Sequence, residues 1–255
     1  MIKAVFLDID GTMVSFNTHC VSEETRKSLR EARKNGVKIF VATGRHRSDI
    51  INLGDLEFDG YMSLNGAYCW VDNQTIFKKS IPQKDVKTFI DFIEKEPKIP
   101  SFFVESDRVT VNFINEEVQK MTELVNFSPR TIVPVSEVAG KEIFQFTAFF
   151  PVEQEPAIME MLPDCFASRW HPAFADIIVK GVDKSVGIQK MSDYFGFSRE
   201  EIMAIGDGGN DISMIKYAGV GVAMGNAEED VKQIADYVTA SVDENGVGQA
   251  LKQFV

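Results

Sequence analysis

The stretch Ala4-Val5-Phe6-Leu7-Asp8-Ile9-Asp10-Gly11-Thr12 decides the fold of this chain of 255 residues. Its first four residues are apolar without interruption, which predicts a strand buried on both faces of a parallel sheet. In open α/β sheets the chemistry lies at the carboxyl ends of the strands. Alternate residues of an extended chain point the same way, so Asp8 and Asp10 can address one point while Ile9 packs beneath them. Two aspartates this close repel each other, and a cation, a shared proton or hydrogen bonds must compensate.

Two more apolar runs end in polar residues, and a lysine stands between them. Residues 39–42 lead into Thr43-Gly44-Arg45, which offers a hydroxyl and backbone amides to an oxyanion. Residues 202–205 lead into Gly206-Asp207-Gly208-Gly209-Asn210-Asp211, a loop of glycines and carboxylates. Lys184 lies near the first turn of a helix predicted between these segments.

The order acid pair, threonine, lysine, acid pair resembles the haloacid dehalogenase-like phosphatases. The four motifs match that superfamily in sequence, in order and in position after predicted strands. The long segment between Arg45 and Lys184 and the form Gly-Asp-Gly-Gly-Asn-Asp are similar to its Cof-type branch, whose members carry a large α/β cap. The resemblance covers essentially the whole chain, although the cap matches by size and pattern only.

Strand and helix alternate at both ends of the chain, which predicts an α/β fold with a doubly wound, mostly parallel, Rossmann-like core. Residues 1–81 and 181–255 are expected to form this core, and residues 82–180 an inserted α+β cap domain. Ser22 is a predicted N-cap for a helix that ends at Gly36. Further predicted core elements are strands at 61–64, 220–223 and 237–239 and helices through 188–191 and 212–217. The insertion is predicted to hold a helix at 85–94 and strands at 102–104, 109–113, 144–147, 165–170 and 176–179.

The resemblance implies a role for each motif residue. Asp8 would be the nucleophile, and Asp10 would protonate the leaving alcohol and later take a proton from water. The expected phosphate-binding residues are Thr43, Gly44, Lys184 and Asn210. The expected cofactor is Mg²⁺, which prefers hard oxygen ligands. Its expected ligands are Asp8, the backbone carbonyl of Asp10, and Asp207, with Asp211 in the outer shell.

Recognition of the rest of the substrate is not explained by these motifs. The insertion is the only segment large enough to supply it, and its polar residues near the return to the core are substrate-binding candidates. Two residues at predicted strand ends of the core are candidates as well. For each of them a plain surface charge, ion pair or turn residue is the competing interpretation. The candidates are Arg45, Asn65, Arg169, His171, Asp176 and Lys180.

Composition restricts the partners. The net charge of −11 argues against nucleic acid or an anionic membrane surface, which are bound through clustered Lys and Arg. No apolar run approaches the roughly 18 residues of a membrane span, and no leader precedes the first strand, so a soluble, cytoplasmic protein is expected. Cys20, Cys69 and Cys165 are scattered, which favours isolated thiols over a disulfide framework. The oligomeric state stays open.

The function expected from the sequence is that of a magnesium-dependent phosphatase. It would hydrolyse small phosphorylated metabolites, sugar phosphates first among them, through an aspartyl-phosphate intermediate. A sugar phosphomutase or phosphotransferase is the nearest alternative. A phospho-acceptor signalling domain is disfavoured by Asp10 and by the insertion, and a non-catalytic binding protein by the full set of motif residues. A dehalogenase is the least favoured, because Asp10 and the magnesium ligands suit phosphate chemistry.

Overall fold

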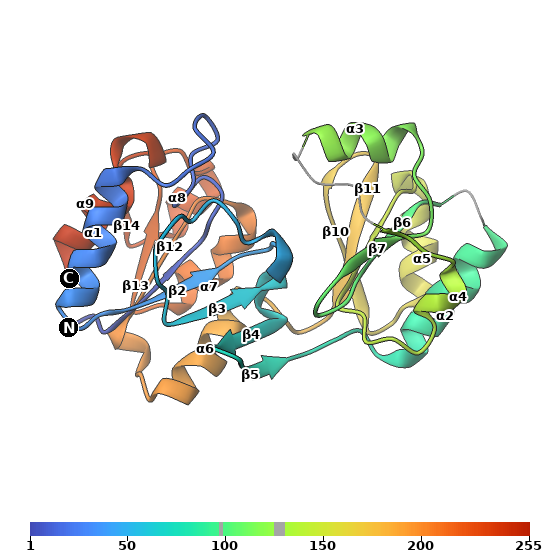
Figure 1. The fold of residues 1–255 in the computed structure, drawn as a ribbon, viewed down its shortest axis with the longest axis horizontal. Coiled ribbons are helices and arrows are strands. Elements are labelled where there is room, and N and C mark those ends of the chain that lie inside the picture. Colours follow the sequence, from blue (N-terminus) through green and yellow to red (C-terminus); the bar gives the residue numbers. More distant parts are fainter. Residues whose placement is uncertain (97–98, 125–130) are drawn as a thin grey trace. The chain divides into compact units, whose positions relative to one another are not determined.

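The chain folds into two units, each with its own sheet. The computed structural model describes residues 1–96, 99–124 and 131–255. The first unit comprises Met1–Lys78 and Val182–Val255, and the second comprises Lys79–Gly181 (Figure 1). The chain therefore leaves the first unit once and returns to it once.

The sheet of the first unit is mostly parallel, with its strands in the order β14-β13-β12-β1-β2-β3-β4-β5. The strand β1 lies near the centre and pairs in parallel with β2 and β12. The hairpin of β4 and β5 is antiparallel and closes one edge. This topology confirms the predicted doubly wound α/β fold. The strands are β1 (Ala4–Leu7), β2 (Lys38–Ala42), β3 (Gly60–Ser63), β4 (Tyr68–Val71), β5 (Gln74–Lys78), β12 (Ile202–Gly206), β13 (Val220–Ala223) and β14 (Tyr237–Val238).

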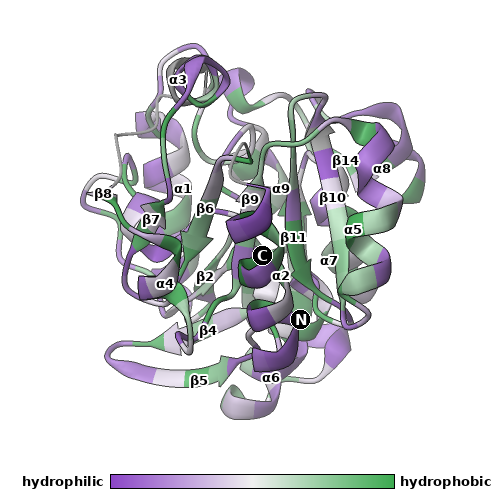
Figure 2. Ribbon diagram, turned by 90° about the vertical axis from the view of Figure 1, so that its right-hand side faces the viewer, coloured by the Kyte–Doolittle hydropathy of each residue, from purple (hydrophilic) through white to green (hydrophobic). Residues whose placement is uncertain are grey.

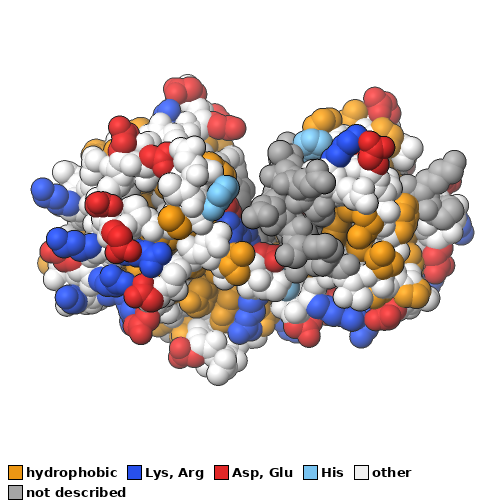
Figure 3. All heavy atoms as spheres, turned by 45° about the horizontal axis from the view of Figure 1, so that its top comes forward, with side chains coloured by type: hydrophobic (Ala, Val, Ile, Leu, Met, Phe, Trp, Pro, Cys, Tyr) orange, Lys and Arg blue, Asp and Glu red, His pale blue; other side chains and the backbone are white. Residues whose placement is uncertain are grey.

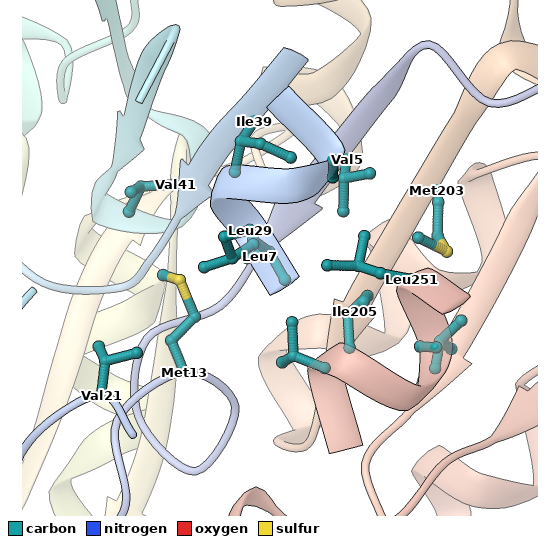
Figure 4. Packing of buried hydrophobic residues seen from close by; sticks show 14 of the residues in the cluster. Val5, Leu7, Met13, Val21, Leu29, Ile39, Val41, Met203, Ile205 and Leu251 are labelled. Atoms are coloured by element: carbon teal, nitrogen blue, oxygen red, sulfur yellow. The ribbon is translucent and has the colours of Figure 1, made fainter. Parts of the chain in front are cut away.

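Helices cover both faces of this sheet, as its apolar strands require. Val5 and Leu7 point to the face that packs against Leu29 of α1 (Glu23–Lys34) and Leu251 of α9 (Gly246–Phe254) (Figure 4). Alternate residues, among them Phe6, point to the opposite face. That face packs against α6 (Lys184–Phe195), α7 (Ile212–Tyr217) and α8 (Glu229–Ile234).

The start of α1 confirms the cap predicted at Ser22, whose hydroxyl accepts a hydrogen bond from the backbone N–H of Thr25. In the colouring of Figure 2 the helices carry hydrophilic as well as hydrophobic residues, as expected where one side faces solvent. Acidic and basic side chains are interspersed on the face of the first unit shown in Figure 3. Short 3₁₀ turns occupy Arg47–Asp49, Leu64–Gly66, Val152–Gln154, Arg199–Glu201, Gly209–Asp211 and Val242–Glu244.

The second unit has a sheet in the order β10-β11-β9-β6-β7-β8, antiparallel except for the pair β7 and β8. On one face of this sheet Phe146 packs against its neighbour Phe103 and against Phe89 of α2. Gln145 and Thr147 alternate with Phe146 and therefore point to the other face. The elements are β6 (Ser101–Val104), β7 (Val109–Val111), β8 (Thr131–Ile132), β9 (Gln145–Ala148), β10 (Cys165–His171), β11 (Phe174–Val179), α2 (Gln83–Lys95), α3 (Glu116–Leu124), α4 (Val135–Val138) and α5 (Glu155–Met161).

Among the residues described, no helix is both long and apolar enough to pass through a membrane.

Candidate active site

Asp8 follows the last residue of β1 and is bound to a buried lysine. Its Oδ1 accepts a hydrogen bond of 2.6 Å from Lys184 Nζ, and the same ammonium donates to Asp211 Oδ1 at 2.5 Å. The side chains of Lys184 and Asp211 are fully buried. Asp211 Oδ2 accepts from the backbone N–H groups of Asp207 and Gly208, so both of its oxygens are engaged. Asp211 therefore holds the loop after β12 and orients the lysine.

Asp207 lies in the same loop and is held by two side chains from other segments. Thr12 Oγ1 donates to Asp207 Oδ1 at 2.8 Å, and Asn226 Nδ2 donates to Asp207 Oδ2 at 3.2 Å. Each carboxylate oxygen has a second lone-pair direction, so these bonds leave room for a cation. Carboxylate oxygens of Asp8, Asp207 and Asp211 all lie within 4.8 Å of one another.

The charges of this cluster do not balance. When all three carboxylates are ionised, the one ammonium of Lys184 leaves two negative charges uncompensated. Burial raises the pKa of Asp8 to about 8, with Lys184 acting against the shift and Asp211 adding to it. Burial likewise raises the pKa of Asp207 to about 7, against the hydrogen bond from Thr12. Burial alone would lower the pKa of Lys184, but the carboxylates of Asp211 and Asp8 outweigh it and raise that pKa.

The carboxylate oxygens of this cluster are suitable ligands for a hard divalent cation. Among the residues that the structure describes, no hydrogen-bond donor contacts Asp8 Oδ2, although the side chain is buried. Mg²⁺ prefers oxygen ligands and is commonly held by one or two carboxylates that leave places for water and substrate phosphate. Two spare negative charges match the charge of such an ion. Asp8 and Asp207 can hold it directly, whereas the engaged oxygens of Asp211 suit the outer position expected for that residue.

Asp10 stands apart from this cluster, because its carboxylate has a cation of its own. Arg45 Nη2 donates to Asp10 Oδ1 at 2.6 Å and Arg45 Nε donates to Asp10 Oδ2 at 2.8 Å. The remaining nitrogen of the guanidinium, Nη1, donates to the backbone carbonyl oxygen of Asp49. Burial would lower the pKa of Arg45, but the hydrogen bonds and charge of Asp10 outweigh it and raise that pKa. Arg45 was a candidate for substrate contact, with an ion pair as the competing interpretation. Its guanidinium is bound to Asp10 and Asp49 in the structure, and contact with substrate stays a prediction.

Three of the four expected phosphate-binding residues, Thr43, Gly44 and Asn210, gather around the end of β2. The Thr43 hydroxyl is buried and accepts from the backbone N–H of Arg45. Asn210 Nδ2 donates to Asn65 Oδ1 at 2.9 Å, and a side chain at Gly44 would come within 3.5 Å of both amide groups. The structure thus brings Asn65 and Asn210 to one place beside Gly44.

Glycines allow the catalytic segments to approach one another closely. Gly11 has a φ of +75°, and a Cβ there would overlap the carboxylate of Asp207. A Cβ at Gly206, the last residue of β12, would overlap the side chain of Asp211. The carboxylates of Asp207 and Asp211 lie against the Cα atoms of Gly11 and Gly206, so a residue with a Cβ would not fit at either position.

The four candidates of the second unit have different surroundings. Arg169 Nε donates to Glu155 Oε2, and its other nitrogens donate to the carbonyl oxygens of Pro172 and Phe150, which favours a structural role. His171 stacks on Phe174, and its Nδ1 accepts from the backbone N–H of Ala173. Lys180 Nζ donates to the carbonyl oxygen of Pro163.

Asp176 differs from those three, because it lies in a polar group on the face of the sheet that points away from Phe146. Its Oδ1 accepts from Thr147 Oγ1 at 2.5 Å and from Gln145 Nε2 at 2.9 Å. A substrate-binding role stays a prediction for Asp176.

Sequence reasoning missed Thr12 and Asn226. Thr12 belongs to the first motif, and its position directly after Gly11 was the available signal. Asn226 is the third residue after β13 and therefore lies at the carboxyl edge of the same sheet, which was the signal for this residue.

The carboxyl ends of the neighbouring strands β1 and β12 carry a buried aspartate and an acidic loop, and the first residue of α6 adds a buried lysine. This arrangement is typical of phosphoryl-transfer hydrolases. The family model of haloacid dehalogenase-like hydrolases matches residues 5–251. The chain belongs to this family and is a phosphatase-type enzyme.

Relatives with known names agree with this assignment. The chain is 45% identical to the solved structure of BT4131, a sugar phosphatase of HAD subclass IIB, with a TM-score of 0.88 and coverage of 99% of this chain and 98% of that one. It is 40% identical to the phosphatase BT1666 of Bacteroides thetaiotaomicron, with a TM-score of 0.90 and coverage of 100% and 95%. It is 31% identical to the 5-amino-6-(5-phospho-D-ribitylamino)uracil phosphatase YitU of Bacillus subtilis, over 98% of this chain and 96% of that protein.

Proposed function

We propose that the protein is a magnesium-dependent phosphatase that hydrolyses small phosphorylated metabolites, sugar phosphates first among them, through an aspartyl-phosphate on Asp8. The observation that carries the proposal is the convergence of Asp8, Lys184, Asp207 and Asp211 at the ends of two adjacent parallel strands. One oxygen of Asp8, Oδ1, accepts from the lysine and keeps a second lone-pair direction for the cation, and the other, Oδ2, is available to a phosphorus atom.

In the first step Asp8 Oδ2 attacks the phosphorus. The Oδ2–P bond forms as the bond from phosphorus to the leaving oxygen breaks. The leaving oxygen takes a proton from Asp10, which must first release one of its two hydrogen bonds from Arg45 and become protonated when the substrate binds. In the second step water attacks the acyl phosphate, Asp10 takes its proton, and the carboxylate of Asp8 leaves. Such acid and base assistance contributes on the order of a hundred- to ten-thousand-fold to the rate.

Charge on the transferring phosphoryl group is met by fixed donors. Lys184 reaches it from the side of Asp8, the Thr43 hydroxyl and the Gly44 backbone N–H from the end of β2, and Asn210 from the loop after β12. Donors held in place before the reaction stabilise developing charge without reorganising. Asp8, Asp207 and the backbone carbonyl of Asp10 would hold Mg²⁺. When bound, it neutralises the excess negative charge that otherwise repels a phosphate dianion.

The substrate class rests on similarity and on the second unit. BT4131, to which the chain is 45% identical, is a sugar phosphatase. The polar group of Gln145, Thr147 and Asp176 in the second unit offers both donors and acceptors. Such groups suit the hydroxyls of a sugar, and we assign them the contacts to the non-phosphate part of the substrate.

The test is phosphate release from a panel of phosphorylated sugars, nucleotides and cofactors, with Mg²⁺ and after exhaustive chelation. Hydrolysis should require the metal, and sugar phosphates should give the highest kcat/KM. The Asp8→Asn variant should show no steady-state turnover while its circular dichroism stays unchanged, because an amide is a poor nucleophile of similar shape. Appreciable turnover by Asp8→Asn would refute the covalent mechanism, and full activity after chelation the metal dependence. Transfer of phosphate to a second sugar in place of release would identify a mutase.

A further inference from the structure

Asn226 is exposed, yet its side-chain amide makes three hydrogen bonds to three different segments. Its Nδ2 donates to Asp207 Oδ2 at 3.2 Å and to the carbonyl oxygen of Gly11 at 2.9 Å. Its Oδ1 accepts from the backbone N–H of Val242 at 2.9 Å. One side chain thus joins the loop after β1, the loop after β12 and the segment after β14.

The three partners allow only one orientation of this amide. Both groups on the Nδ2 side are acceptors, and the group on the Oδ1 side is a donor. A turned amide would place oxygen against two oxygens and nitrogen against an N–H group, and all three bonds would be lost. Asn226 can therefore present only a donor to Asp207.

The backbone that carries Asn226 is held on both sides. The N–H of Met224 donates to the carbonyl oxygen of Gly206, and the N–H of Gly225 donates to that of Ala240. A Cβ at Gly225 would lie 2.7 Å from the backbone nitrogen of Ser241, so glycine is needed for this approach. The position of the amide is thus fixed relative to the loop that holds Asp207.

We infer that Asn226 is a positioning residue for Asp207 and sets the affinity of the site for its divalent cation. Asp207 is the one carboxylate of the buried cluster that receives no hydrogen bond from Lys184, so its direction depends on Thr12 and Asn226. Groups that orient a metal ligand in this way commonly contribute ten- to hundred-fold to metal affinity. The inference rests on the magnesium dependence proposed above.

The experiment compares Asn226→Ala with Asn17→Ala. Asn17 is also exposed, and its Nδ2 also donates to a carboxylate, that of Asp243, but it has no contact with Asp207. Protein stripped with a chelator is titrated with Mg²⁺ in a calorimeter, and the Tm of the stripped protein and kcat at saturating Mg²⁺ are measured beside it. We expect the Kd for Mg²⁺ to rise about ten- to hundred-fold in Asn226→Ala and to stay within about twofold in Asn17→Ala. Saturating Mg²⁺ should restore most of kcat.

Thr12→Val keeps the side-chain shape at the buried residue Thr12 and removes the other donor to Asp207. Like Asn226→Ala, it should raise the Kd for Mg²⁺. This second variant keeps the inference testable if Asn226→Ala folds poorly. A lower Tm of stripped Asn226→Ala with an unchanged Kd would show a merely structural role and overturn the inference. Failure of the unaltered protein to bind Mg²⁺ would overturn the proposed metal dependence and this inference with it.

Discussion

At the scale of single residues, the two cations near β1 are divided unequally among four aspartates. Of these four carboxylates Arg45 binds that of Asp10, whereas Asp8 and Asp211 share Lys184, and Asp207 accepts from the neutral side chains of Thr12 and Asn226. The first pair is neutral as a unit, and the second group keeps an excess of negative charge. A bound divalent cation would balance this excess on the side of Asp8 and Asp207.

The excess charge should make the stability of the metal-free protein depend on pH. The pKa of Asp8 is raised from 3.8 to about 8, so the folded chain binds a proton that the unfolded chain releases. The stability from this proton is full below pH 3.8 and is lost as the pH rises through about 8. Asp8→Asn cannot ionise and should escape this loss. We therefore expect the Tm of the chelated protein to fall below that of Asp8→Asn increasingly from pH 4 to 8, by several degrees. Parallel Tm profiles of the two proteins would contradict the expectation.

The pair of Arg45 and Asp10 predicts a dependence on the leaving group. Arg45→Lys keeps the charge but loses the two-pronged contact with Asp10, so the carboxylate is held less firmly. We expect kcat/KM to fall about tenfold on alkyl phosphates, whose leaving oxygen needs a proton, and less on p-nitrophenyl phosphate. This direction follows from the acid role proposed for Asp10.

A control for this prediction is the same substitution in an Asp10→Asn background. There Arg45→Lys should cause no further difference between alkyl and nitrophenyl substrates. An equal loss on both substrates in the otherwise unaltered protein would mean that Arg45 acts on the phosphoryl group or on the fold.

At the scale of elements, α6 brings Lys184 to Asp8 by packing very closely against the turn after β3. A Cβ at Gly187 would overlap the side chain of Met62 and come within 2.9 Å of the Cα of Gly66. Gly66 in turn has a φ of +92° and lies against the carbonyl oxygen of Asp183. The two glycines thus set the distance between the first turn of α6 and the catalytic edge of the sheet.

Gly187→Ala should displace the start of α6 and with it Lys184. Overpacking of this kind costs about 1–3 kcal/mol of stability, and a lowered Tm and a lowered kcat should appear together. Gln189→Ala on the exposed side of the same helix is the matched control and should change neither. Thermal melts and kcat on one sugar phosphate measure both effects. A Gly187→Ala variant with the original kcat would show that the close contact is dispensable.

The elements also show what could be predicted from the sequence. Strands such as β1, β2 and β12 are continuous apolar runs, and their burial on both faces requires that pattern. The strand β5 was missed because it is largely exposed and has no such pattern. The helix α9 was missed as well. It contains Gly246 and Gly248, which lower helix propensity, and it packs against α1.

For the candidate site, the sequence predicted the acids, the threonine and the lysine, since each follows or opens a recognisable element. It could not identify their partners, because these depend on the order of the strands. Arg45 meets Asp10 because β2 lies beside β1, and Asn226 meets Asp207 because β13 lies beside β12. Strand order is a property of the assembled sheet and cannot be predicted from the motifs alone.

At the scale of the whole molecule, the two units separate phosphate chemistry from the proposed recognition of the substrate. The motif residues all belong to the first unit, and the polar group around Asp176 belongs to the second. Changes in the second unit can then act either on specificity or on its own stability. Two of its residues allow these effects to be distinguished.

Asp176→Ala should change the order of kcat/KM among sugar phosphates, by about tenfold for individual substrates, and leave p-nitrophenyl phosphate almost unaffected. Arg169→Ala should instead lower the Tm, because Arg169 joins Glu155 to two backbone carbonyls. Its effect on activity should be equal for every substrate. If Asp176→Ala lowered kcat/KM equally on every substrate, Asp176 would have a structural role and no role in specificity.

The central place of β1 has a consequence for the synthesis of the protein. One neighbour of β1 is β2, which follows soon after it, but the other is β12, which begins at Ile202. At about 5–20 residues per second, a ribosome needs on the order of ten seconds to make the intervening chain. During that time one apolar edge of the nascent sheet is unpaired, and edges of this kind invite aggregation. The strand that leads into Asp8 can thus become a central strand only after about four fifths of the chain have been translated, and transient chaperone binding to this edge would protect the nascent protein.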